Sequence, residues 1–140
     1  MTAEQMKDIV RRSVSEFWNT GNMKALPKTW HTNYKGHDPS GMHAGDLAQF
    51  TATCKALFAA FTGIEVVIDD LLVDGDQVVK RWTATATHTG DFMGIPASGN
   101  SLEFTGIDIY RIADGKIVEA WVNSDTLGFM QQIGAVPKMG

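Results

Sequence analysis

Asp108 is an acid in a segment of the sequence that alternates like a β-strand. In the stretch GIDIYRIADGKIVEAWV, residues 106–122, it stands between two isoleucines. Successive strand residues point to opposite faces, so the residues that share its face are Phe104, Gly106 and Tyr110. On an enclosed face the charged form of a carboxylate is disfavoured, which lets the group exchange protons near neutral pH.

Two histidines are candidates for assisting Asp108, because an imidazole titrates near neutral pH. His88 ends a predicted strand just before a glycine, where a histidine also serves as a core or turn residue. His37 lies in the loop sequence GHDPSG, where it could instead cap a turn. Asp108 has a structural alternative as well, in which it accepts loop amides or pairs with a buried histidine. The residues predict acid–base catalysis by Asp108, His88 and His37 and leave these structural roles open.

Other chemistries lack the residues that they need. His31, His37 and His43 recur every six residues, an interval that matches no common pattern of metal ligands. The single cysteine, Cys54, belongs to an apolar helical stripe and has no suggested base to activate it. The sequence has no GxSxG, no phosphate-binding glycine loop and no GxGxxG. We therefore expect neither a metal nor a cofactor.

Composition narrows the class of protein. The chain has 140 residues, 44% of them hydrophobic, which fits a single domain over 1–140. Twelve Lys and Arg against 16 Asp and Glu give a net charge of -4 without a basic run, so we expect no nucleic-acid partner. The N-terminus MTAEQMKDIV lacks a secretory signal, and no segment is long enough to cross a membrane. With only one cysteine, these absences favour the cytoplasm.

The first part of the sequence has helical periodicity. Thr2 and Gln5 form a capping box ahead of apolar residues at helical spacing, which continue until a glycine. We expect a shorter second helix over about 23–30, a polar loop over 33–45, and a third helix over 47–61.

From residue 64 onward the period changes to two. This predicts strands over about 64–73, 78–88 and 102–112, and a fourth that ends near 123. DG sequences supply two of the turns, and a short closing helix follows SDTLG. Helices first and an antiparallel meander after indicate an α+β fold with the helices on one sheet face.

The helix-facing side of this sheet has small residues where a filled core would have large ones. They are Ala84, Ala86, Gly106 and Ala120. The aromatic residues expected to enclose the remaining space are Trp18, Trp30, Trp82, Phe104 and Tyr110. The result would be an apolar pocket for a small molecule, with Asp108 and His88 as its polar groups.

The opposite sheet face is predicted to carry threonines and charges. Arg81 and Arg111 could meet Glu103 and Glu119 across strands, a mixture that suits water or a second subunit. The loop GDFMGIPASGN, residues 90–100, is unusually apolar for a connection. It could close over the pocket or pack against a second subunit.

Long stretches of the chain resemble the SnoaL-like polyketide cyclases of the nuclear transport factor 2-like superfamily. They are RWTATATHTGDFMGIPASG (81–99) and FTGIDIYRIADGKIVEAWVNSDTLGFMQQIG (104–134), together with SEFWNTGN and GHDP. The resemblance implies a cone-shaped, curved, mixed or antiparallel sheet wrapped by three N-terminal helices, with a short C-terminal helix. It also implies an apolar pocket, a homodimer or higher oligomer, and ring closure by aldol condensation without metal or cofactor.

Carried over by position, the cyclase pattern departs at one key residue. The catalytic aspartate of the cyclases matches Val122, which cannot exchange protons, while Asp108 matches a pocket histidine and His37 falls near a polar pocket position. We expect an enzyme that moves protons in a small apolar, even polycyclic, carbonyl compound, as an aldol-type cyclase or isomerase. The alternative is a dimeric protein that binds such a ligand in a pocket lined by Val122 without turning it over. Hydration or dehydration is a third option, since it needs only a positioned acid and base.

Overall fold

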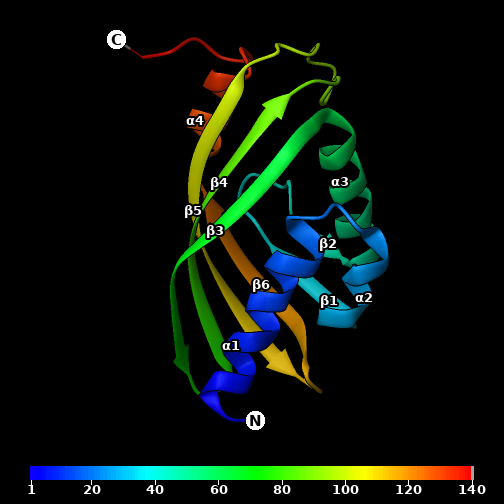
Figure 1. Ribbon diagram of the computed structural model, residues 1–140, viewed down its shortest axis with the longest axis vertical. Coiled ribbons are helices and arrows are strands. Elements are labelled where there is room, and N and C mark those ends of the chain that lie inside the picture. The colour runs from blue at the N-terminus through cyan, green and yellow to red at the C-terminus, as the bar shows by residue number, and fades with distance from the viewer. Residues whose placement is uncertain (140) are drawn as a thin grey trace.

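A curved, unclosed, six-stranded mixed sheet forms the framework of the computed structural model, which describes residues 1–139 (Figure 1). Its strands are β1 (Trp30–His37), β2 (Gly45–Asp46), β3 (Phe61–Asp74), β4 (Gln77–His88), β5 (Ser101–Ala113) and β6 (Lys116–Ser124). Their order is β2-β1-β6-β5-β4-β3, and of these neighbours only β1 and β6 run parallel within the described residues.

The helices lie mainly on one side of this sheet (Figure 1). They are α1 (Ala3–Arg12), which continues as the π-helical η1 (Ser13–Trp18), then η2 (Met23–Ala25), α2 (Leu26–Thr29), α3 (Leu47–Ala60) and α4 (Thr126–Gln132). The predicted capping box is present: the Gln5 amide donates to the Thr2 hydroxyl at 3.1 Å, and the Thr2 amide donates to Gln5 Oε1 at 2.8 Å. The predicted class, α+β with a curved sheet, N-terminal helices and a short closing helix, is confirmed.

The expected loop over 33–45 is wrong in its first part, because residues 30–37 form strand β1. This strand pairs in parallel with β6, more than 80 residues away: Lys35 lies opposite Glu119 and Gly36 opposite Ala120. Its buried residues, Trp30, Tyr34 and Gly36, share one face, but the exposed Thr32 interrupts the alternation and the segment has the Asn and Gly typical of loops. The third helix also ends one residue early, at Ala60, and β3 begins at Phe61.

The two faces of the meander are as the alternation predicted. On β5 the residues Gly106, Asp108 and Tyr110 are buried, whereas Thr105 and Ile107 between them are exposed. Residues of the buried face pack against the helices in one core that includes side chains of α1, α3 and β6. The outer face carries ion pairs, as expected. The predicted pair of Arg111 and Glu119 is present at 3.2 Å, whereas Arg81 pairs with Asp70 at 2.6 Å and not with Glu103.

A second apolar cluster lies at the far end of the sheet, where α4 packs. It contains Phe61, Leu102, Phe129 and, from the loop before β5, Phe92. Phe92 is buried there while its neighbour Met93 is 76% exposed, so the apolar loop is anchored by one side chain and presents another to solvent. Within residues 1–139, no helix is both long and apolar enough to span a lipid bilayer.

Candidate functional site

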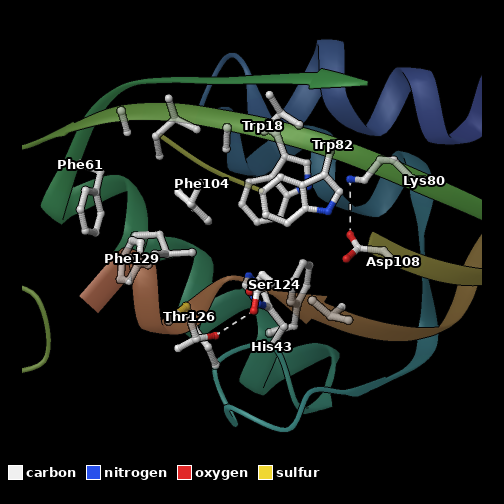
Figure 2. A pocket seen from close by; sticks show the side chains of 18 of the residues that line it. Trp18, His43, Phe61, Lys80, Trp82, Phe104, Asp108, Ser124, Thr126 and Phe129 are labelled. Carbon is white, nitrogen blue, oxygen red and sulfur yellow. Dashed lines mark hydrogen bonds and ion pairs between the residues drawn. The ribbon is translucent and has the colours of Figure 1, made fainter. Parts of the chain in front are cut away.

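The space predicted between the helices and the sheet is present as a cavity of about 100 Å³ (Figure 2). Six of the seven predicted binding residues line it, and they are Trp18, Trp30, Trp82, Phe104, Tyr110 and Val122. The seventh, Gly106, does not line it within the described residues. A Cβ at this position would overlap the Trp82 ring, so the glycine lets that ring lie flat on β5. Gly106 therefore affects the pocket indirectly, by setting the position of the Trp82 ring that lines it.

Aromatic side chains hold the pocket open by packing against one another. Trp18 contacts Trp30 and Phe50 edge-on, with ring centroids 6.5 Å and 6.1 Å apart. Trp82 contacts Phe104 in the same way at 5.5 Å. The indole nitrogens of Trp30 and Trp82 are buried, and within residues 1–139 they have no hydrogen-bond partner. Each is a buried donor that a ligand oxygen could satisfy.

Asp108 lies at one end of this pocket on β5 and is 5% exposed. The Tyr110 hydroxyl donates to its Oδ2 at 2.6 Å. Lys80 Nζ lies 3.6 Å from the same oxygen (Figure 2). Its second oxygen, Oδ1, is buried without a partner in the described part of the chain. One oxygen of the carboxylate is thus held in place, and the other is free to accept a proton or a hydrogen bond from a ligand.

Lys80, on β4, was missed as a site residue in the sequence, although the alternation of β4 puts it on the pocket face with Trp82. It is 3% exposed and lies directly opposite Asp108 in the β4–β5 register. Burial lowers the pKa of Lys80, and this outweighs the nearby negative charge of Asp108, which raises it. Burial also raises the pKa of Tyr110, and Asp108 adds to that effect, so the phenol stays a proton donor.

A second polar group, His43, lines the pocket from the loop between β1 and β2. Its Nδ1 lies 3.1 Å from Asp38 Oδ2, and its backbone amide donates to the same oxygen at 3.0 Å. Burial opposes the negative charge of Asp38, but hydrogen bonds from His43 and Ser40 outweigh it and lower the pKa of this carboxyl. Because an ionised carboxylate only accepts, we assign the proton to Nδ1, which leaves Nε2 as an acceptor. A base oriented by a carboxylate is a recurring catalytic arrangement.

The two other predicted histidines are not brought together with Asp108. His37 lies on the outer side of the sheet, where Nε2 is 2.7 Å from Glu119 Oε2 and the ring stacks on Trp121. His88 shares the inner face with Asp108, but it is eight residues beyond Lys80 along β4, about 26 Å at about 3.3 Å per residue. It is fully buried and outside the pocket lining, stacked on Phe61 with Nδ1 accepting the Ser98 amide at 3.1 Å.

The three histidines at six-residue spacing also point to different places. Each pairs with its own carboxylate: His31 with Asp114, His37 with Glu119 and His43 with Asp38. Within residues 1–139, no three His, Cys, Asp or Glu side chains cluster as metal ligands would.

Comparisons with known proteins agree with this architecture. The family model described as SnoaL-like polyketide cyclase matches residues 8–133. Aklanonic acid methyl ester cyclase DnrD of Streptomyces peucetius is 28% identical over 132 residues, which are 91% of this chain and 89% of that protein.

Two solved structures extend the comparison. A candidate polyketide cyclase from Acidithiobacillus ferrooxidans is 33% identical with a TM-score of 0.82, covering 92% of this chain and 94% of that one. AclR from Streptomyces galilaeus superimposes with a TM-score of 0.89 over 99% of this chain and 87% of that one. At 22% identity AclR shows the fold alone.

Proposed function

The chain belongs to the SnoaL-like polyketide cyclase family, and from this premise we propose that it is a cofactor-independent enzyme that moves protons in a small apolar carbonyl compound. Membership in the family and a relative named as a cyclase support a cyclase-type role. The observation that carries the proposal is the free, buried Oδ1 of Asp108 inside an apolar pocket. An aldol-type cyclisation or an isomerisation is the reaction class that such a group serves.

In the proposed reaction Asp108 acts as general base. Its Oδ1 removes a proton from the carbon next to the substrate carbonyl, and the resulting enolate attacks a second carbonyl to close a ring or is reprotonated elsewhere to isomerise. Tyr110 holds Oδ2 and keeps the carboxylate oriented. We propose His43, oriented by Asp38, as the second acid–base group in place of His88 and His37, because His43 lines the pocket.

The position of the acid is consistent with this role despite the valine at 122. Asp108 and Val122 lie directly opposite each other in the β5–β6 register. The side chains of such a pair are about 4.5–5.5 Å apart at Cβ. A carboxylate at 108 therefore serves the same part of the pocket as one at 122 would.

The test is exchange of the α-hydrogens of 1-tetralone and acetophenone for deuterium, followed by NMR. We expect the wild-type protein to catalyse this exchange and Asp108→Asn to slow it by about 10²–10⁴-fold, the usual contribution of a general base. Asp70→Asn makes the same chemical change on the outer sheet face and should leave the rate unchanged. For the second group, His43→Gln should slow exchange, with His31→Gln as its matched control. Unchanged exchange in Asp108→Asn would reject the proposed role.

A second function is favoured by the apolar lining and by Val122, namely binding of a small apolar ligand without turnover. Under this alternative, thermal-shift screening with polycyclic ketones, terpenoids and sterols would give stabilisation. The same ligands would show no exchange in wild-type protein, which separates binding from catalysis.

We further propose that the protein forms a homodimer or higher oligomer through the outer sheet face. The support is a set of exposed apolar side chains there among the ion pairs: Val67, Leu72 and Ile107. Light scattering after size exclusion would measure the assembly, and Ile107→Lys should weaken it.

A further inference from the structure

Lys80 differs from every other lysine in the described part of the chain, because it alone is buried and it alone lines the pocket. Its Nζ lies 5.2 Å from the centroid of the Tyr110 ring and 5.9 Å from that of Trp82. Figure 2 shows Lys80 beside Trp82 and Asp108. Lysine is almost never fully buried unless it is paired, because its ammonium group loses its water. A buried lysine inside a ligand pocket therefore calls for a chemical reason.

The pairing of Lys80 is incomplete. The nearest carboxylate oxygen, Asp108 Oδ2, is 3.6 Å away, longer than a direct hydrogen bond, and it already accepts the Tyr110 hydroxyl at 2.6 Å. Burial lowers the pKa of Lys80 more than Asp108 raises it. A larger share of its amine is then neutral near pH 7 and carries the lone pair that a nucleophile needs.

We propose that Lys80 forms a Schiff base with the carbonyl group of the molecule bound in the pocket, with Asp108 as the proton carrier for its formation and hydrolysis. This inference rests on the proposed function in one respect, namely that the pocket accepts carbonyl compounds. It adds a covalent route that acid–base chemistry alone does not include.

The step balances with the groups present and water. Nζ adds to the carbonyl carbon, a C–N bond forms, and an amine proton moves to the carbonyl oxygen to give a carbinolamine. Asp108, which holds the proton that the Lys80 ammonium released when Nζ became neutral, gives it to that hydroxyl, the C–O bond breaks and water leaves. A protonated imine on Lys80 and a carboxylate on Asp108 remain side by side. The carboxylate can next remove the α-proton to give an enamine, and returning water releases the product and the amine.

Reductive trapping tests the proposal on the wild-type protein. Benzaldehyde and sodium cyanoborohydride are added at neutral pH, and N-benzyl lysines are mapped by tandem mass spectrometry. We expect Lys80 to be labelled faster than exposed Lys24 and Lys55, because its lowered pKa leaves a larger share of its amine neutral and the pocket holds the aldehyde beside it. Labelling of the exposed lysines with none on Lys80 overturns the proposal.

Benzaldehyde has no α-hydrogen, so this result does not depend on proton abstraction by Asp108. The two proposals therefore fail separately. If Lys80→Met keeps the α-exchange of 1-tetralone while Asp108→Asn loses it, the Schiff base is rejected and the proposed function stands. If Lys80 is labelled but wild-type protein shows no α-exchange, the Schiff base stands and the proposed function fails. Methionine matches the length and apolar stem of lysine, and a thermal melt confirms that Lys80→Met folds.

Discussion

Replacing Asp108 by asparagine should destabilise the protein in a pH-dependent way, because it leaves Lys80 buried without a counter-charge. Removing one partner of a buried ion pair costs about 3–5 kcal/mol. This loss of stability has an upper limit, because the lysine can release its proton and remain buried as a neutral amine. From an ordinary lysine pKa of about 10.4, neutralising it at pH 7 costs about 4.6 kcal/mol, at 1.36 kcal/mol per unit.

The sign of the pH effect follows from proton counting. Without Asp108 the pKa of Lys80 falls further, so folded Asp108→Asn holds a neutral amine while the unfolded chain binds the proton. Stability then rises with pH up to about 10.4, with a slope of about 1.4 kcal/mol per pH unit. The cost of neutralising Lys80, which sets the upper limit on the loss of stability, falls accordingly to about 1.9 kcal/mol at pH 9.

Urea denaturation at pH 7, 8 and 9 measures this, with Lys80→Met/Asp108→Asn as the reference variant because it has no buried amine. The single variant should be the less stable of the two at pH 7, and the gap should narrow by about 1.4 kcal/mol per pH unit. A gap that stays constant with pH would show that Lys80 keeps its proton in the folded variant, and hence that it is not buried as described. The same urea denaturation curves also give the m-values, which should be equal if both variants unfold in two states.

Two further predictions concern Gly106, which lies behind the Trp82 ring, and Asp38, which contacts the pocket residue His43. Gly106→Ala should lower the free energy of unfolding by about 1–3 kcal/mol, because its Cβ overlaps the Trp82 ring. In thermal melts the same substitution should cost less when Trp82→Phe is also present. An equal loss with tryptophan and with phenylalanine at 82 would contradict the overlap. Asp38 has a lowered pKa when folded, so the stability it contributes is present above its unfolded pKa of about 3.9 and is lost as pH falls below it. The stability difference between wild type and Asp38→Asn should therefore shrink below about pH 4, and a difference independent of pH would argue against this charge.

The alternation of side chains along strands accounts for what the sequence could predict of the site. It places Asp108 and Tyr110 on the inner face, and the same rule places Lys80 there, although a lysine in a strand reads at first as a solvent-facing residue. Alternation gives the face but not the distance along the strand. His88 therefore has the correct face and lies far from Asp108, behind Phe61.

The remaining features depend on pairings that are remote in sequence. Strand β1 exists because it adds in parallel to β6, and no local pattern in 30–37 reports that partner. The direction of His37 follows from this pairing, since His37 lies opposite Trp121 and stacks on it outside the sheet. His43 reaches the pocket because Asp38, five residues earlier, fixes its ring, a contact that requires the whole loop to fold back.

The strand register places the acid at 108 beside the buried lysine. Lys80, Asp108 and Val122 lie in one row across β4, β5 and β6. Neighbouring strands are about 4.8 Å apart, so an acid at 122 would stand two strands from Lys80, about 10 Å away. At 108 it is the direct neighbour, with 3.6 Å between Nζ and Oδ2. The aspartate at 108 therefore stands where the Schiff base that we propose needs its proton carrier, which an acid at 122 would not be close enough to provide.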